Sequence, residues 1–308
     1  MQGLVIKNSG SWYLVKTDAG DLVECKIKGS FRIRDIRTTN PIAIGDRVHF
    51  EQIDNVSGLI YEICERRNYV IRRSSNLSKH AHILAANLDL AVLIVTIKHP
   101  VTYTIFIDRF LATAEAYRIP ACLVFNKIDC YDDDDFEYLR AVSHLYTTLG
   151  YPIFEVSALQ PETLSALIDF LKGKINLFSG NSGVGKSTLI KAILPDIDIK
   201  IGDISAAHHR GTHTTTLSEM YALENGGYII DTPGIKGFGL VDMEKDEIGH
   251  YFKEIFMFSK KCKFSNCRHI HEPDCAVRKA VENHEISQSR YQSYLNILND
   301  CDSEKYRV

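Results

Sequence analysis

The sequence has no long uninterrupted hydrophobic run and no excess of positive charge. Its longest apolar stretch, residues 83–97, is interrupted by Asn87 and Asp89 and is shorter than the roughly 20 residues that a membrane-spanning helix needs. The formal net charge of −3 excludes a uniformly basic nucleic-acid-binding protein, so any contact with RNA must use local basic patches. We therefore expect no membrane partner.

An export signal is also missing, because the first residues, MQGLVIKNSGSWYLV, contain no basic segment followed by an apolar core. We therefore expect a cytoplasmic protein, and we expect it to be monomeric. In a reducing compartment, clustered members of the eight cysteines are better explained by metal ligation than by disulfides. The 308 residues, of which 45% are hydrophobic, are enough to bury two or three separate cores.

Residues 1–72 contain five short runs of apolar and β-branched residues, separated by turn residues such as glycine, asparagine and aspartate. This pattern predicts a small closed β-barrel. An OB-fold, which often binds oligonucleotides such as RNA, is the commonest barrel of this size, although an SH3-like barrel would give nearly the same pattern. The five runs are residues 4–7, 12–16, 22–26, 47–52 and 58–63.

The segment that follows, ERRNYVIRRS, is basic. Its four arginines flank Tyr69, and arginines with an interleaved aromatic side chain suit phosphate contact and base stacking. A solvated linker whose arginines pair with nearby acids would have the same composition. Both interpretations stay open from the sequence. The arginines are Arg66, Arg67, Arg72 and Arg73.

Residues 73–240 alternate continuous apolar runs with stretches of helical spacing, which predicts an α/β domain with a parallel sheet covered on both faces. Ligands of such sheets bind at the carboxyl ends of the strands. The acidic run at 132–135 lacks the spacing of a calcium loop and is expected to begin a helix. The expected strands are 90–95, 121–125, 153–156, 175–178 and 228–230, and the expected helices are 107–117, 136–149 and 163–171.

The stretch GNSGVGKST fits the P-loop pattern GxxxxGK[ST]. Glycine lets the backbone turn its amide groups around a phosphate, Lys186 adds a positive charge for the outer phosphates, and Ser187 offers a hydroxyl to Mg²⁺. A helix expected at 189–194 would point the positive end of its dipole at the same anion. The predicted nucleotide-binding residues are Gly180, Asn181, Ser182, Gly183, Val184, Gly185, Lys186, Ser187 and Thr188.

A second motif, NKxD, directly follows the expected strand 121–125. It comprises Asn126, Lys127, Ile128 and Asp129. The Asp129 carboxylate can accept two hydrogen bonds, and guanine presents a ring N1–H and an exocyclic amine where adenine offers no such donor pair. The motif therefore predicts GTP rather than ATP. A short loop after the next strand, containing Ser157 and Ala158, is expected to support the base through a backbone amide.

A third motif, DTPG, follows the strand expected at 228–230. Asp231 is expected to hold Mg²⁺ through water, and the Gly234 amide to sense the γ-phosphate. Between the P-loop and DTPG, the segment 208–216 contains Thr214 and Thr215, one of which is expected to ligate Mg²⁺. Because Ile235 stands where a Ras-type enzyme carries its water-orienting glutamine, intrinsic hydrolysis should be slow or should depend on another group. His213 is the nearest candidate, although it could instead contact RNA or solvent.

The order of the motifs is unusual. In an ordinary Ras-like GTPase the P-loop precedes NKxD, whereas here NKxD and the Ser157-Ala158 loop precede the P-loop. The sequence therefore predicts a circularly permuted GTPase domain, an arrangement that a compact domain tolerates when its original termini lie close together at the surface.

Residues 241–308 are expected to form a mostly helical domain, with a last helix at 289–298, around a metal site. Cys262, Cys267, His269 and Cys275 would make a closed tetrahedral Cys₃His site for one structural Zn²⁺. His271 competes with His269, because alternate spacing lets only one ring point inward. The surrounding basic residues suggest an RNA-binding knuckle.

These motifs together resemble the RsgA family, also called YjeQ or YloQ, over essentially the whole chain. That resemblance implies a GTPase that binds the 30S ribosomal subunit late in its maturation. It also implies contact with 16S rRNA through the barrel and the zinc domain, and faster GTP hydrolysis on the subunit. The family's usual GRHTTT reads GTHTTT here, with Thr212 in place of arginine.

Two other classes of protein stay open. The absence of the glutamine is compatible with a purely RNA-binding assembly or translation factor that uses its nucleotide site as a slow timer. An ATP-dependent enzyme, such as a kinase or a transporter ATPase, is disfavoured by the NKxD motif.

Overall fold

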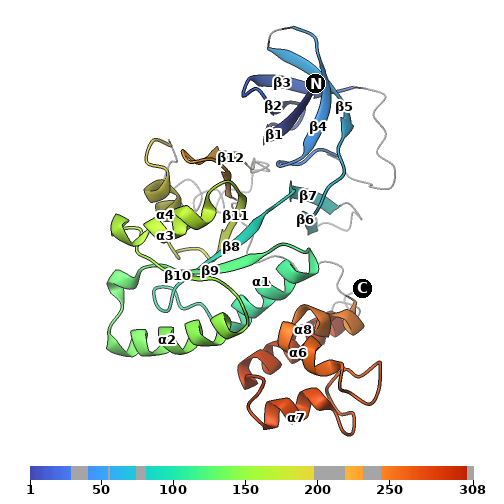
Figure 1. Ribbon diagram of the computed structural model, residues 1–308, viewed down its shortest axis with the longest axis vertical. Coiled ribbons are helices and arrows are strands. Elements are labelled where there is room, and N and C mark those ends of the chain that lie inside the picture. Colours follow the sequence, from blue (N-terminus) through green and yellow to red (C-terminus); the bar gives the residue numbers. More distant parts are fainter. Residues whose placement is uncertain (29–40, 55, 74–80, 198–218, 232–243, 304–308) are drawn as a thin grey trace.

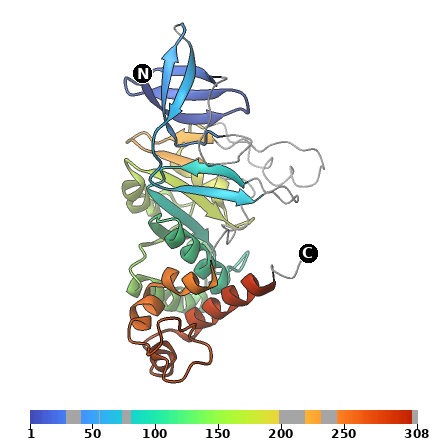
Figure 2. The same cartoon turned by 90° about the vertical axis from the view of Figure 1, so that its right-hand side faces the viewer.

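The computed structural model describes residues 1–28, 41–54, 56–73, 81–197, 219–231 and 244–303. A small barrel, an α/β domain and a helical module follow one another along the long axis (Figures 1 and 2). No helix among these residues is long and apolar enough to cross a bilayer. The domain limits expected from the sequence, 72/73 and 240/241, stay predictions, and the second falls outside the described residues.

The barrel consists of five strands that close on themselves in the order β1-β2-β3-β5-β4-β1. All neighbouring pairs are antiparallel except β3 and β5, which are parallel. Alternate residues such as Val15, Val23 and Phe50 fill the interior, as the period of two requires. This is an OB-fold, and the SH3-like alternative is excluded. The strands are β1 (Gln2–Asn8), β2 (Tyr13–Thr17), β3 (Leu22–Ile27), β4 (Arg47–Gln52) and β5 (Ser57–Ile63).

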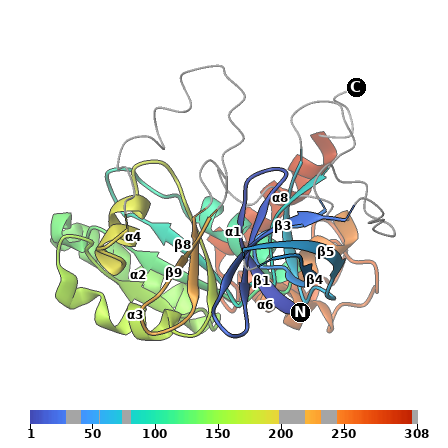
Figure 3. The same cartoon turned by 90° about the horizontal axis from the view of Figure 1, so that it is seen from above.

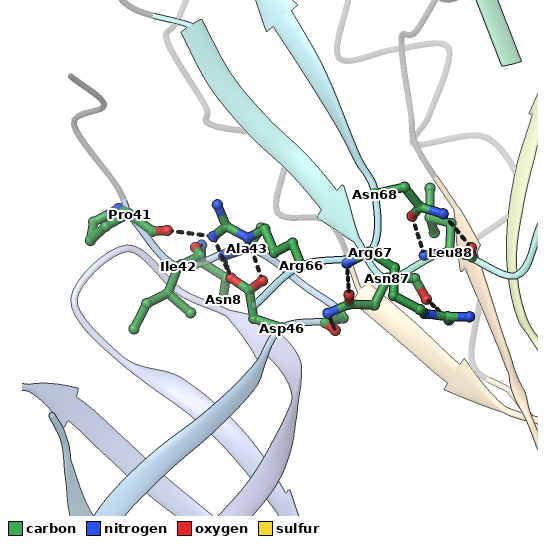
Figure 4. A network of polar contacts seen from close by, with 11 residues as sticks. Asn8, Pro41, Ile42, Ala43, Asp46, Arg66, Arg67, Asn68, Asn87 and Leu88 are labelled. Carbon is green, nitrogen blue, oxygen red and sulfur yellow. Dashed lines mark hydrogen bonds and ion pairs between the residues drawn. The ribbon is translucent and has the colours of Figure 1, made fainter. Parts of the chain in front are cut away.

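A two-stranded ribbon that the sequence did not predict, β6 (Tyr69–Arg73) and β7 (Ala81–Ala86), connects the barrel to the α/β domain. The same junction carries a polar network (Figure 4). Arg66 binds the buried Asp46 carboxylate with Nε and Nη2 at 2.6 and 2.7 Å. Arg67 donates to Asp89 at 2.7 Å. These two arginines thus pair with acids at a domain junction, as the linker interpretation predicted, whereas the side chains of Arg72 and Arg73 lie outside the described set.

The α/β domain contains the strands β10-β9-β8-β11-β13-β12 in this order, and of these described strands β12 alone is antiparallel to its neighbour in the domain, β13. Strands β8 and β9 are buried at every position, which explains their continuous apolar sequence. Strand β12 also pairs with β1, so the barrel continues the sheet. The strands are β8 (Leu90–Val95), β9 (Ala121–Phe125), β10 (Ile153–Glu155), β11 (Ile175–Gly180), β12 (Glu219–Ala222) and β13 (Tyr228–Asp231).

Helices cover both faces of this sheet. Residues of α1 and α2 pack into the core on one face, and residues of α3 and α4 pack into the core on the other. Seen from above, α2, α3 and α4 lie on the left, and the barrel lies on the right with α6 and α8 (Figure 3). Asp132 caps α2, as expected for the start of the acidic run. The helices are α1 (Thr104–Ala116), α2 (Asp133–Thr148), α3 (Ser165–Leu171) and α4 (Lys186–Ile193), with 3₁₀ turns at Ile128–Cys130 and Pro161–Thr163.

The C-terminal module is helical, as predicted, and packs on α1. Its last helix runs along α1, and Ala112 of α1 belongs to the core of the module. Arg290 of α8 is buried and reaches both Glu254 in the module and Asp108 in α1. The elements are a 3₁₀ helix (Lys245–Tyr251), α6 (Lys253–Ser259), α7 (Ala276–Glu282) and α8 (Gln288–Ser303), the last of which is longer than the predicted 289–298.

Candidate nucleotide and metal sites

The P-loop connects β11 to α4 at the carboxyl edge of the sheet. The helix begins at Lys186 rather than at the predicted residue 189, and Gly185 precedes it with φ of 86°. A Cβ at Gly185 would lie 2.5 Å from Asn126 Nδ2, so glycine is needed for the left-handed turn and for the close approach. The Lys186 ammonium pairs with the Asp231 carboxylate, which ends β13. The P-loop lysine and the first residue of DTPG are therefore brought together.

Asn126 joins three loops. Its Nδ2 donates to Val184 O of the P-loop at 2.8 Å, and its Oδ1 accepts from the Ala158 amide at 3.1 Å. The side chain is 1% exposed, so both ends of the amide are satisfied inside the protein. Three segments that are far apart in the sequence thus meet through one side chain, at the edge where an α/β sheet binds its ligand.

The two other polar residues of the NKxD loop (residues 126–129) differ in their surroundings. Lys127 forms hydrogen bonds within the protein, and Asp129 is exposed. Lys127 has a left-handed backbone, and its ammonium donates to the Gly183 and His99 carbonyl oxygens, each at 2.6 Å. Asp129 accepts a hydrogen bond from the Ser157 hydroxyl. That bond is the main cause that lowers the pKa of the Asp129 carboxyl, so the group is ionised at neutral pH. An ionised, largely exposed carboxylate can accept hydrogen bonds from a ligand.

Four predicted site residues cannot be placed. His213, Thr214, Thr215 and Gly234 lie outside the described residues, so their roles stay predictions.

The predicted metal ligands lie together in the C-terminal module. The ligand atoms of Cys262, Cys267, His269 and Cys275 are all within 4.8 Å of one another. His269 Nδ1 lies 3.6 Å from Cys262 Sγ and 3.4 Å from Cys275 Sγ, whereas His271 is not part of the cluster. Three thiols and one imidazole at these separations fit a tetrahedral ion with sulfur ligands at about 2.3 Å. The donor set therefore suits Zn²⁺.

Residues around this cluster were not identified from the sequence. Glu272 accepts hydrogen bonds from the amides of Arg268, Ile270 and His271 at 2.7, 2.8 and 3.1 Å. The Tyr291 and Tyr294 hydroxyls donate to the carbonyl oxygens of His269 and Arg268 at 2.6 and 2.7 Å. These contacts hold the ligand loop in place. In the sequence, only Glu272 could have been noticed, as a carboxylate inside a basic metal-binding stretch. Nothing in the sequence marks Tyr291 or Tyr294.

Basic residues of the module are partly engaged within the protein. Arg268 pairs with Asp246 at 2.8 Å, and Lys279 with Asp274 at 3.0 Å. Lys260, Lys261 and Lys263 lie over the rings of Phe256, Phe258 and Phe264.

A sheet with NKxD upstream of the P-loop, preceded by an OB-fold and followed by a Cys₃His module, defines a circularly permuted P-loop GTPase with two accessory domains. Family models described as the RsgA GTPase and the RsgA N-terminal domain match residues 63–241 and 2–60. The chain belongs to the RsgA family and is a GTPase.

Curated relatives and solved structures agree with this assignment. The chain is 62% identical to small ribosomal subunit biogenesis GTPase RsgA 2 of Bacteroides thetaiotaomicron, over 100% of this chain and 99% of the relative. It is also 62% identical, with the same coverage, to RsgA of Phocaeicola vulgatus. YjeQ from Thermotoga maritima superimposes with a TM-score of 0.79 at 36% identity, over 97% of both chains. YloQ, described as a circularly permuted GTPase, gives 0.80 at 30% identity, over 100% of this chain and 96% of YloQ.

Proposed function

We propose that this chain hydrolyses GTP while bound to the small (30S) ribosomal subunit, acts in the late maturation of that subunit, and is stimulated by it. The supporting observation is the joining of the P-loop, the NKxD loop and the 157–158 loop through Asn126, in a chain whose relatives are named for small-subunit biogenesis. Recognition of 16S rRNA is assigned to the barrel (residues 1–72) and the metal module (residues 241–308). The GTPase domain is assigned to residues 73–240, and the protein to the cytoplasm as a monomer.

In the proposed mechanism, the amides of residues 180–188 and the Lys186 ammonium bind the phosphates of GTP or GDP. Lys186 exchanges its present partner, Asp231, for phosphate oxygens. Asn126 holds the P-loop, the NKxD loop and the 157–158 loop together, and Asp129 accepts hydrogen bonds from the two donor groups of guanine. Ser187, Asp231 and one threonine of Thr214 and Thr215 are the residues that would hold Mg²⁺, which neutralises charge on the phosphates. His213 is proposed to position the attacking water, because Ile235 cannot.

Turnover measurements with purified subunits test the proposal. Added 30S subunits should raise the rate of GTP hydrolysis at least about tenfold, because a positioned proton-transfer or water-orienting group contributes about 10² to 10⁴-fold. Purified 50S subunits serve as the control and should give no increase. Equal rates with and without 30S subunits would instead favour a timer that only regulates RNA binding, and equal affinity for ATP and GTP would favour an ATP-dependent enzyme.

We also propose that the Cys₃His cluster holds one structural Zn²⁺. Purified protein should contain one zinc per chain by elemental analysis, and Cys267→Ala should lose it and lower the melting temperature, because structural zinc stabilises the fold that binds it. Cys130→Ala, which changes an exposed cysteine outside the cluster, is the matched control and should retain zinc. Full zinc content in Cys267→Ala would remove that residue from the site.

A further inference from the structure

Residues 97–100, the 97–100 segment between β8 and α1, lie beside the NKxD loop and the start of α2. The Ile97 amide donates to the Tyr131 hydroxyl at 2.8 Å. The Lys98 ammonium binds Asp132 at 2.8 Å and also Asp135. The His99 carbonyl accepts from Lys127, and Pro100 Cδ is 3.4 Å from the position that a Cβ on Gly183 would take. Lys127 also donates to Gly183 O, so it links the 97–100 segment to the P-loop as well as to the NKxD loop.

The 97–100 segment has a defined conformation because two buried threonines close it. The Thr96 hydroxyl donates to Pro100 O at 2.5 Å. The Thr96 amide donates to the Thr102 hydroxyl at 3.2 Å, and the Thr102 amide donates to Thr96 O at 3.0 Å. The two side chains are 0% and 5% exposed. Because these hydrogen bonds fix its conformation, the 97–100 segment can hold the residues that it contacts in position.

Tyr131 completes the connection from the other side. Its hydroxyl accepts from the Ile97 amide and donates to the Asn126 carbonyl oxygen at 2.8 Å. The residue is 9% exposed, and its ring packs edge-on against Phe136 at 5.8 Å. Burial raises the pKa of the phenol to about 12, so the hydroxyl keeps the proton that it donates. One hydroxyl therefore links the 97–100 segment to the asparagine that joins the three loops.

We propose that Tyr131 is a positioning residue for guanine selection, which, with the 97–100 segment, holds the NKxD loop against the P-loop so that Asp129 meets the base. This inference rests on the proposed function, because it assumes that Asp129 contacts guanine. Tyr131 itself touches no nucleotide in this scheme. Its hydrogen bond acts on the main chain of Asn126, three residues before Asp129, and so sets where the carboxylate lies.

Calorimetric titration of the full-length chain with GDP and with IDP tests this. IDP lacks the exocyclic amine of guanine, so the ratio of the two affinities reports how well Asp129 meets that amine. In Tyr131→Phe, which keeps the ring and removes two hydrogen bonds, GDP affinity should fall about tenfold and the preference for GDP over IDP should shrink, because the main chain of Asn126 loses its link to the 97–100 segment. Thr96→Val, which opens the loop from the other side, should change both quantities in the same direction.

Tyr151→Phe is the matched control. Tyr151 is a buried phenol of the same core cluster, but its hydroxyl donates to Glu115 at 3.2 Å, away from the nucleotide loops. Its loss should leave both affinities unchanged. Unchanged GDP affinity in Tyr131→Phe, or equal losses for GDP and IDP, would overturn the positioning role. A wild-type chain that does not prefer GDP over ADP would instead refute the proposed function.

Discussion

Asp129→Asn should reverse the nucleotide preference of this protein from guanosine to xanthosine. The carboxylate accepts hydrogen bonds from the N1–H and the exocyclic amine in the proposed complex, and an amide nitrogen at that place cannot accept them. Xanthine carries an oxygen where guanine has the amine, so the new amide can donate to it. The Ser157 hydroxyl, which now donates to Asp129, can donate equally to the amide oxygen and hold the nitrogen toward the base.

The expected effect is large. Hydrogen bonds to charged groups contribute about 1.5–3 kcal/mol each, so losing two weakens GTP binding at least about 100-fold. Titration of the wild type and the variant with GTP and XTP measures it. Asp134→Asn makes the same chemical change on the exposed first turn of α2 and should alter neither affinity. If Asp129→Asn bound GTP as well as the wild type, the guanine assignment would be wrong.

Arg290→Met should destabilise the contact between the C-terminal module and the GTPase domain more than any surface substitution. The Arg290 side chain is 1% exposed and donates to both oxygens of Glu254, at 2.7 and 3.1 Å. It also donates to Asp108 Oδ1 at 2.7 Å, which accepts from Tyr146 too. Burial alone would lower the pKa of the guanidinium, but the two carboxylates raise it, so the group stays charged. Methionine would leave two buried carboxylates without their cation.

Removing one partner of a buried ion pair costs about 3–5 kcal/mol, and this value is the expected loss in free energy of unfolding. The urea midpoint, followed by circular dichroism of the helices, measures it. Arg109→Met is the matched control, because Arg109 forms a partly exposed pair with Asp300 on the same two helices and should cost at most about 1 kcal/mol. The triple variant Arg290→Met/Asp108→Asn/Glu254→Gln should recover much of the loss. Equal midpoints for Arg290→Met and Arg109→Met would contradict this account.

Local motifs could be predicted from the sequence because their chemistry depends on residues that are close together in the chain. The P-loop, NKxD and the cysteine–histidine spacing are of this kind, and the structure places their described members where strands end or in one cluster. The start of α4 was missed by three residues, because Lys186, Ser187 and Thr188 are polar and carry no apolar periodicity. Ribbon β6–β7 was missed because β6 (YVIRR) has the composition of a basic linker, and β7 (AHILAA) is rich in alanine, which has a low strand propensity.

The sequence by itself determined the class of this protein. Three motifs and the 157–158 loop in a permuted order, with five strand-like runs before them and a Cys₃His pattern after them, define a permuted GTPase between a barrel and a metal module. Only the tertiary structure decided how these parts are joined. The closing strand order of the barrel and the pairing of Arg66 with Asp46 were open until segments distant in the chain were placed together. The OB-fold and the His269 ligand were favoured by the sequence, and the structure excludes the SH3-like barrel and leaves His271 out of the cluster. The physical reason is that the periodicity and composition of a sequence indicate whether a side chain is buried. They do not indicate which distant residue forms its hydrogen bond or ion pair. Tyr131 and Arg290 are the clearest cases, since each acts through hydrogen bonds to groups that the sequence does not mark.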